Sequence, residues 1–176
     1  MRNSPTRGFT LLEVLVALLI FSLGVLGMAG LLAMSVRTNH SAYLRTQATF
    51  LAQSIADRMR ANASWALWTN AYNGSWTGPA SASNAANCQA GGTSTSCAYT
   101  DVANRDIAVW TLQISRFLPN ATESINCSGA PSIPVSTYQM LPPYGGTCTV
   151  TINWSESTLA VAGSPDTETL SWVFQP

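Results

Sequence analysis

The chain has 176 residues, of which 47% are hydrophobic and 9% charged, and its eight basic side chains balance its eight acidic ones. A chain of this length has room for one small domain beside a long helix, but not for two domains. Because nucleic-acid surfaces need clustered basic side chains, the low and balanced charge argues against a nucleic-acid partner.

An apolar stretch without a charged residue runs from Val14 to Val36. At about 1.5 Å per residue, a helix of this length covers roughly 35 Å, enough to cross a hydrocarbon core of about 30 Å. Arg2 and Arg7 precede the stretch, and the positive-inside rule then keeps the N-terminus in the cytoplasm. We therefore expect one membrane-spanning helix, with the rest of the chain outside the cytoplasm.

One acidic side chain, Glu13, stands at the start of this apolar stretch. An acid at the centre of a spanning helix costs about 2.5 to 3.5 kcal/mol, and such residues usually mark a function with a nameable partner. The alternative is an acid at the membrane interface that is simply favoured by the positive end of the helix dipole. Position alone leaves both interpretations open.

The residues around Glu13 resemble the processing signal of type IV pilins and pseudopilins. That signal has a glycine, a phenylalanine and Thr-Leu-Leu-Glu ahead of an apolar helix, and this chain has it from Gly8 to Glu13. The resemblance implies that a prepilin peptidase cuts between Gly8 and Phe9 and methylates the new Phe9 amine. It also implies that Glu13 faces the Phe9 amine of a neighbouring subunit, the cation that a carboxylate needs in low dielectric.

Three glycines, Gly24, Gly27 and Gly30, follow at three-residue spacing. They would form a narrow strip that permits close approach of another helix, although the spacing is not that of GxxxG. Major pilins commonly have a helix-weakening proline where this chain has Gly30, so unwinding of this segment in a filament stays open. Membrane glycines without a special role are the alternative.

From Arg37 onward the apolar residues recur at three- and four-residue spacing, which is typical of an amphipathic helix packed on a globular domain. We expect one helix from about Phe9 to Asn62, on the order of 80 Å long. Residues 41–48 and 56–62 also resemble the minor pilins called type IV pilus modification proteins, of the PilV kind. The expected buried stripe is Leu44, Ala48, Leu51, Ala52, Ile55 and Met59, with Arg45, Gln47, Gln53, Asp57 and Arg60 opposite.

The stretch from Trp65 to Thr100 is rich in Ser, Asn, Ala and Gly, which favours a loop. Its aromatic side chains are nevertheless too many to stand free in water, so we expect them to pack on the helix or the sheet. An exposed aromatic surface for a neighbouring pilin or a ligand is the alternative. The aromatic residues concerned are Trp65, Trp68, Tyr72 and Trp76.

A second helix is expected from Asn104, as an N-cap with Asp106 in the first turn, to Pro119, which ends it. Part of this segment also alternates as a strand would, at Trp110, Leu112 and Ile114. The helix is favoured because Asp106, Trp110 and the pair Leu118-Pro119 again resemble the pilus modification proteins. Its apolar stripe is expected to be Ile107, Trp110, Ile114, Phe117 and Leu118.

The C-terminal third predicts strands. After the turn residues Pro142 to Gly146, apolar and polar residues alternate through Cys148, Val150, Ile152 and Trp154, as in a half-buried strand. Another strand is expected from about Glu168 to Phe174, with Leu170, Trp172 and Phe174 on one face. Further strands should lie within Cys127 to Met140 or Cys88 to Thr100. The fold class is therefore α+β: a long N-terminal helix laid on a small antiparallel sheet.

The four cysteines, Cys88, Cys97, Cys127 and Cys148, allow three disulfide pairings. Chain order and short loops favour Cys88 with Cys97 and Cys127 with Cys148. Disulfides agree with a location outside the cytoplasm. A metal centre is disfavoured because the chain has no C-x-x-C and its single histidine, His40, lies far away on the helix, so we expect no metal and no cofactor.

These patterns divide the chain into four parts: a cleaved leader at 1–8, a membrane-spanning assembly half of the helix at 9–36, an amphipathic half at 37–62, and an extracytoplasmic head at 63–176. The resemblance implies partners in prepilin peptidase, other minor and major pilins, the inner-membrane assembly platform and membrane lipid. It implies a bacterial inner-membrane protein with a periplasmic head that later enters the pilus fibre or its tip.

The expected function is that of a minor pilin, a structural subunit in type IV pilus assembly and priming, with effects on twitching and attachment. A minor pseudopilin of a type II secretion system is one alternative, and a membrane-anchored adhesin is another. An enzyme is not expected, because the sequence has no phosphate-cradling glycine loop and no acid pair at a telling spacing.

Overall fold

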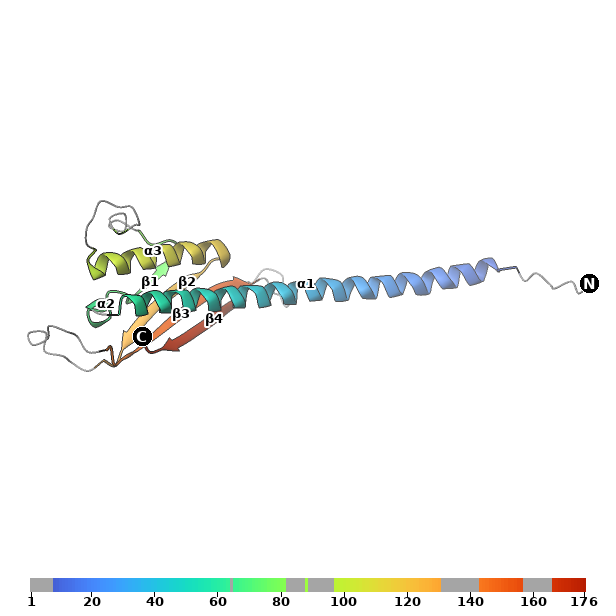
Figure 1. The fold of residues 1–176 in the computed structure, drawn as a ribbon. Helices are drawn as coiled ribbons and strands as arrows, with labels where there is room; N and C mark the ends of the chain where they lie inside the picture. Colours follow the sequence, from blue (N-terminus) through green and yellow to red (C-terminus); the bar gives the residue numbers. More distant parts are fainter. Residues whose placement is uncertain (1–7, 64, 82–87, 89–96, 131–142, 157–165) are drawn as a thin grey trace, which may run out of the picture. The chain divides into compact units, whose positions relative to one another are not determined.

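The computed structural model describes residues 8–63, 65–81, 88, 97–130, 143–156 and 166–176. The chain divides into two compact units, residues 1–42 and 43–176. The predicted α+β class is confirmed (Figure 1). In chain order the elements are α1 (Leu11–Ala61), α2 (Trp65–Trp68), β1 (Gly74–Thr77), α3 (Tyr99–Phe117), β2 (Thr122–Ser128), β3 (Thr147–Glu156) and β4 (Asp166–Phe174).

Helix α1 begins and ends within two residues of the predicted bounds. In the unit formed by residues 43–176, the apolar residues of α1 that recur every three or four positions are buried. They form one stripe, because residues at this spacing share one side of a helix. The prediction of this stripe is confirmed, and the structure adds one alanine to it. The buried residues are Leu44, Ala48, Leu51, Ala52, Ile55, Ala56 and Met59.

The sheet has four antiparallel strands in the order β1-β2-β3-β4. The predicted alternation in β3 is confirmed, since Cys148, Val150, Ile152 and Trp154 are all buried. In β4, Phe174 is buried and Leu170 and Trp172 are half-buried on the same face, as expected. Serine, threonine and asparagine side chains fill almost all of the opposite face, so only one face of the sheet contributes to the core.

The other two strands lie elsewhere than the sequence suggested. Strand β1 falls inside the stretch taken for a loop, and β2 overlaps the expected range only from Cys127 onward. Within Cys88 to Thr100, Tyr99 and Thr100 are helical, while residues 89–96 and 131–140 lie outside the described residues. The alternation of β2 is hidden because a carboxylate, Glu123, takes a position that faces the core.

Helix α3 confirms the choice of helix over strand, but its predicted start is wrong. It begins at Tyr99 with Ala98 as N-cap, so Asn104 lies inside the helix and Asp106 is a buried mid-helix residue. The buried Ala103 explains the earlier start, because the first turns also pack on the core. Of the expected stripe, Ile107, Trp110, Ile114 and Leu118 are buried, whereas Phe117 is exposed.

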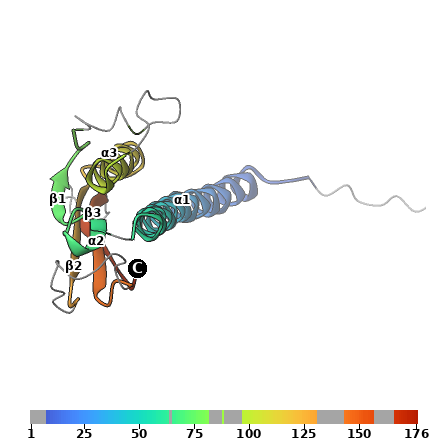
Figure 2. The ribbon, with the colours of Figure 1, turned by 60° about the vertical axis from the view of Figure 1, so that its left-hand side comes forward.

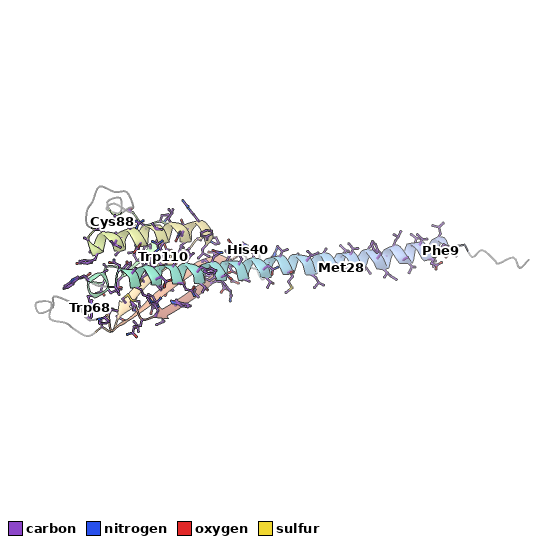
Figure 3. All side chains as sticks on the ribbon, in the orientation of Figure 1. Phe9, Met28, His40, Trp68, Cys88 and Trp110 are labelled. Atoms are coloured by element: carbon purple, nitrogen blue, oxygen red, sulfur yellow. A yellow bond between two sulfur atoms is a disulfide. The ribbon has the colours of Figure 1, made fainter. Side chains whose placement is uncertain are left out.

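Both α3 and the C-terminal part of α1 cover the apolar face of the sheet (Figure 2). Trp110, labelled in Figure 3, joins α1, α3 and the sheet. Its Nε1 donates to the Leu51 carbonyl oxygen at 2.9 Å, and its ring and that of Trp76 form a T-shaped pair with centroids 6.3 Å apart. Tyr72 is buried, and Trp68 and Trp76 pack against the core. The expected packing is confirmed for these three aromatic residues, whereas Trp65, the fourth, is half-buried and is not among the residues of the core cluster.

Candidate assembly and processing site

The residues at the expected cleavage point form an exposed segment ahead of the first helix. Gly8 and Phe9 have no regular secondary structure, and Phe9 is 81% exposed. A peptidase needs a backbone that is free of helical hydrogen bonds, and this segment provides one. The basic residues Arg2 and Arg7 lie outside the described residues.

Thr10 caps the helix and fixes the place of Glu13. The backbone N–H of Glu13 donates to the Thr10 carbonyl oxygen at 3.1 Å and lies 3.3 Å from the Thr10 hydroxyl oxygen. Thr-x-x-Glu at a helix start is the spacing of a capping box, in which both side chains satisfy free backbone N–H groups. Sequence reasoning missed this role of Thr10, although the three-residue spacing from threonine to glutamate could have revealed it.

Glu13 is exposed in the first turn of α1, where the positive end of the helix dipole favours its charge. Among the described residues the ion pairs are Arg45–Glu168, Arg58–Asp106 and Arg60–Asp57, so Glu13 has no cationic partner there. Its carboxylate can therefore serve as a cap, as a charge for another molecule, or as both.

The first part of α1 exposes all of its apolar side chains. Every residue from Gly8 to His40 is exposed, including Met28 (Figure 3), and α1 is long and apolar enough to cross a membrane by length and composition. The Ser22 and Thr38 hydroxyls donate to carbonyl oxygens one turn earlier, at 2.7 and 3.1 Å. Such internal bonds are compatible with a surrounding that offers no water.

The glycine strip is open. A Cβ placed on Gly24, Gly27 or Gly30 would meet no heavy atom within 4 Å, and α1 is helical through all three positions. The three glycines therefore leave a shallow groove on the helix surface, and no side chain of the described residues occupies this groove.

The compact unit of residues 43–176, called the head from here on, contains two disulfides and a set of polar contacts. The bonds join Cys88 to Cys97 and Cys127 to Cys148, and the second links the adjacent strands β2 and β3. Sequence reasoning missed a buried polar cluster in which Asp106 accepts from Arg58 Nη1 at 3.1 Å and from the Tyr72 hydroxyl at 2.9 Å. Burial is the main cause that raises the pKa of Tyr72, so its hydroxyl stays a donor.

No group of three or more His, Cys, Asp or Glu that could hold a metal occurs in the part of the chain that the structure describes. His40 is exposed on α1, within the unit of residues 1–42. The residues expected to carry function therefore fall into two sets: Gly8, Phe9 and Glu13 at the helix start, and the four cysteines in the head.

Comparison with known proteins adds one finding at the first of these sets. Residues 3–29 match the family model described as the prokaryotic N-terminal methylation motif, a motif of type IV pilin-like proteins. The match covers the expected cleavage point, Thr10 and Glu13. No curated protein and no solved structure matches the chain.

Proposed function

We propose that this chain is a minor pilin, a structural subunit that takes part in the assembly and priming of a type IV pilus. One observation carries the proposal: the methylation motif at residues 3–29 leads into an apolar helical segment whose side chains are all exposed. An apolar surface of this kind is stable only in lipid or against other helices, and a pilin uses both in turn. The resemblance of residues 41–48 and 56–62 to pilus modification proteins supports the minor role.

In this proposal the prepilin peptidase cleaves between Gly8 and Phe9 and methylates the Phe9 amine. The exposed chain at that point and the cap at Thr10 support it, because the helix starts just beyond the cleavage point and contains no residue of the leader. The head stays in the periplasm while the helix is anchored in the inner membrane. Assembly then transfers the subunit, with other pilins and the assembly platform, into the fibre.

Glu13 is proposed to pair with the Phe9 amine of the neighbouring subunit. Its exposure and the lack of a cation for it among the described ion pairs support this role. A carboxylate in a low dielectric is costly unless a cation approaches it, so the pair would favour correct axial register between subunits.

The test separates the charge of Glu13 from its capping role. Glu13→Gln keeps a capping-box side chain but removes the charge, Glu13→Ala removes both, and Asp57→Asn neutralises an exposed carboxylate of the same helix as a control. We expect both Glu13 variants to enter the membrane normally and to be lost from sheared pili, while Asp57→Asn is recovered like the wild type. Normal recovery of Glu13→Gln would show that the charge is not needed.

Deletion of the chain, read out by recovery of sheared pili and by protein export, distinguishes the other functions, together with the same fractionation. A minor pseudopilin of a type II secretion system would leave pili intact when deleted and would block protein export. A membrane-anchored adhesin would stay in the membrane fraction, and its Glu13 variants would bind as well as the wild type. Loss of piliation on deletion, with export intact, supports the minor pilin.

A further inference from the structure

Glu123 is a buried carboxyl group without a hydrogen-bond partner. It lies on the core-facing side of β2, it is 2% exposed, and neither Oε1 nor Oε2 accepts a hydrogen bond from any described residue. Buried polar groups are nearly always paired, so each exception needs an explanation. Burial raises the pKa of Glu123 to about 7, which makes the neutral acid a populated form near physiological pH.

The groups around Glu123 offer no counter-charge. Its strand neighbours are Trp76 on β1 and Ile152 on β3, and β1 contains no titratable residue. On α3, the buried acid Asp106 is already bound by Arg58 and Tyr72.

The remaining charges do not change this. The other charged side chains of α3 lie at half-buried or exposed positions, and burial is the one cause acting on the Glu123 pKa. The chain has no lysine, and residues 82–96, 131–142 and 157–165 contain no charged residue at all. The α3 residues concerned are Asp101, Arg105 and Arg116.

Strand β1 is the most weakly held element beside this carboxyl. It has four residues, lies at the edge of the sheet and, among the described strands, pairs only with β2. Its Trp76 covers the core side: the indole folds back over Gly74, where an added Cβ would lie 2.6 Å from Cζ2, and it packs at an interplanar angle of 87° against the Trp110 ring. Two firmer attachments flank the strand.

The first attachment is Asn73, whose Nδ2 donates to the Cys127 carbonyl oxygen and whose Oδ1 accepts from the Cys127 N–H. The second is Ala80, whose N–H donates to the Thr111 hydroxyl on α3 at 2.8 Å. The chain is therefore anchored by side-chain hydrogen bonds just before the strand and a few residues after it. Gly78, with a φ of 82°, gives the segment a turn next to the second attachment.

We propose that the segment from Gly74 to Pro79 is a proton-controlled flap, closed over the core when Glu123 is neutral and opened when Glu123 ionises. An ionised Glu123 needs water, because no side chain among the described residues supplies a hydrogen bond or a cation. Lifting Trp76 away is the smallest movement that lets water in, since the other neighbours are central strand and helix residues. Loss of the proton to solvent is the only chemical change.

The direction in which pH moves the flap follows from the difference in proton affinity between its closed and open forms. The pKa of Glu123 in the closed form is about 7, above its ordinary value of 4.5, so the closed form binds the proton more tightly than the open form. The advantage of the closed form is complete below the ordinary pKa and is lost as the pH rises through the closed-form value. Acid therefore closes the flap, and base opens it.

The test follows amide hydrogen exchange of the full chain in detergent micelles between pH 5 and pH 9, corrected for the intrinsic pH dependence of exchange. Protection of the β1 amides that bond to β2 should fall by about tenfold or more across neutral pH, while the amides of β3 should stay protected. Tryptophan fluorescence should change over the same range, and Trp76→Phe should remove most of that change.

Two variants separate Glu123 from other groups. Glu123→Gln should hold the flap closed and leave both signals flat with pH. Glu156→Gln, which alters a less buried carboxyl that accepts from Trp154 Nε1 at 2.8 Å, should keep the wild-type transition. A transition that persists in Glu123→Gln would overturn the proposal. So would wild-type exchange of β1 that does not depend on pH, a measurement that needs no variant to fold.

Discussion

The two halves of α1 have the same secondary structure and opposite surroundings. Between Leu11 and Ala42 a leucine such as Leu19 is 61% exposed, whereas between Tyr43 and Ala61 Leu51 is 6% exposed. Burial stabilises by roughly 25 cal/mol per Å² of apolar surface, so the second half gains that stability within the chain itself. The first half can gain it only from lipid or other helices, which is why we assign assembly to that half and folding of the head to the other.

The largest expected difference between the two halves of α1 is in the free energy of unfolding of the head when one leucine in each half is replaced by alanine. Leu51→Ala should lower the free energy of unfolding of the head by about 2 to 5 kcal/mol, because it leaves a cavity in the core. Leu19→Ala removes the same atoms from an exposed position and should leave head unfolding unchanged. Near-ultraviolet circular dichroism of the full chain in micelles measures both, and equal effects would contradict the division of α1.

A second, smaller difference concerns the disulfides. Replacing Cys127 and Cys148 together by alanine removes a bond across 21 residues, which should cost about 3 kcal/mol of head stability. The helicity of residues 11–42 should not change. Peptide mapping without reduction checks the pairing first: fragments joining Cys88 to Cys127 would refute it.

The smallest expected effect is that of the surface ion pair between Arg45 and Glu168, 2.9 Å apart. The Arg45 side chain is 60% exposed, so Arg45→Ala should cost less than about 1 kcal/mol, and less still in high salt. Thermal unfolding at low and high ionic strength measures it. A loss comparable to that of Leu51→Ala would mean that charge, rather than burial, joins this part of α1 to the sheet.

The parts of the fold that were predictable from sequence are those in which apolar residues keep a regular period. The stripe from Leu44 to Met59 and the alternation from Cys148 to Trp154 have such periods, and both are buried as expected. Strand β2 was not predictable, because Glu123 breaks the alternation with a charge that is normally exposed. Strand β1 was missed because Gly74 and Ser75 favour turns, and only pairing with β2 makes them a strand.

The candidate site shows the same contrast. The residues from Gly8 to Glu13 pointed to the processing motif through their resemblance to the signal of type IV pilins, in which these residue types follow one another at set positions. The cap formed by Thr10 was also readable from the three-residue spacing between threonine and glutamate, and the structure shows it as a bond from the Glu13 N–H to the Thr10 hydroxyl oxygen. The cluster of Arg58, Asp106 and Tyr72 joins three separate segments, and no local pattern predicts such a meeting.

The measurement that tests the central claim most directly is the intact mass and N-terminal sequence of the protein from a piliated strain, with and without its prepilin peptidase. The account predicts a chain that starts at N-methylated Phe9 when the peptidase is present, and an unprocessed chain when it is absent. An unprocessed chain in both strains would contradict it, and would leave the motif around Gly8 as a membrane anchor alone.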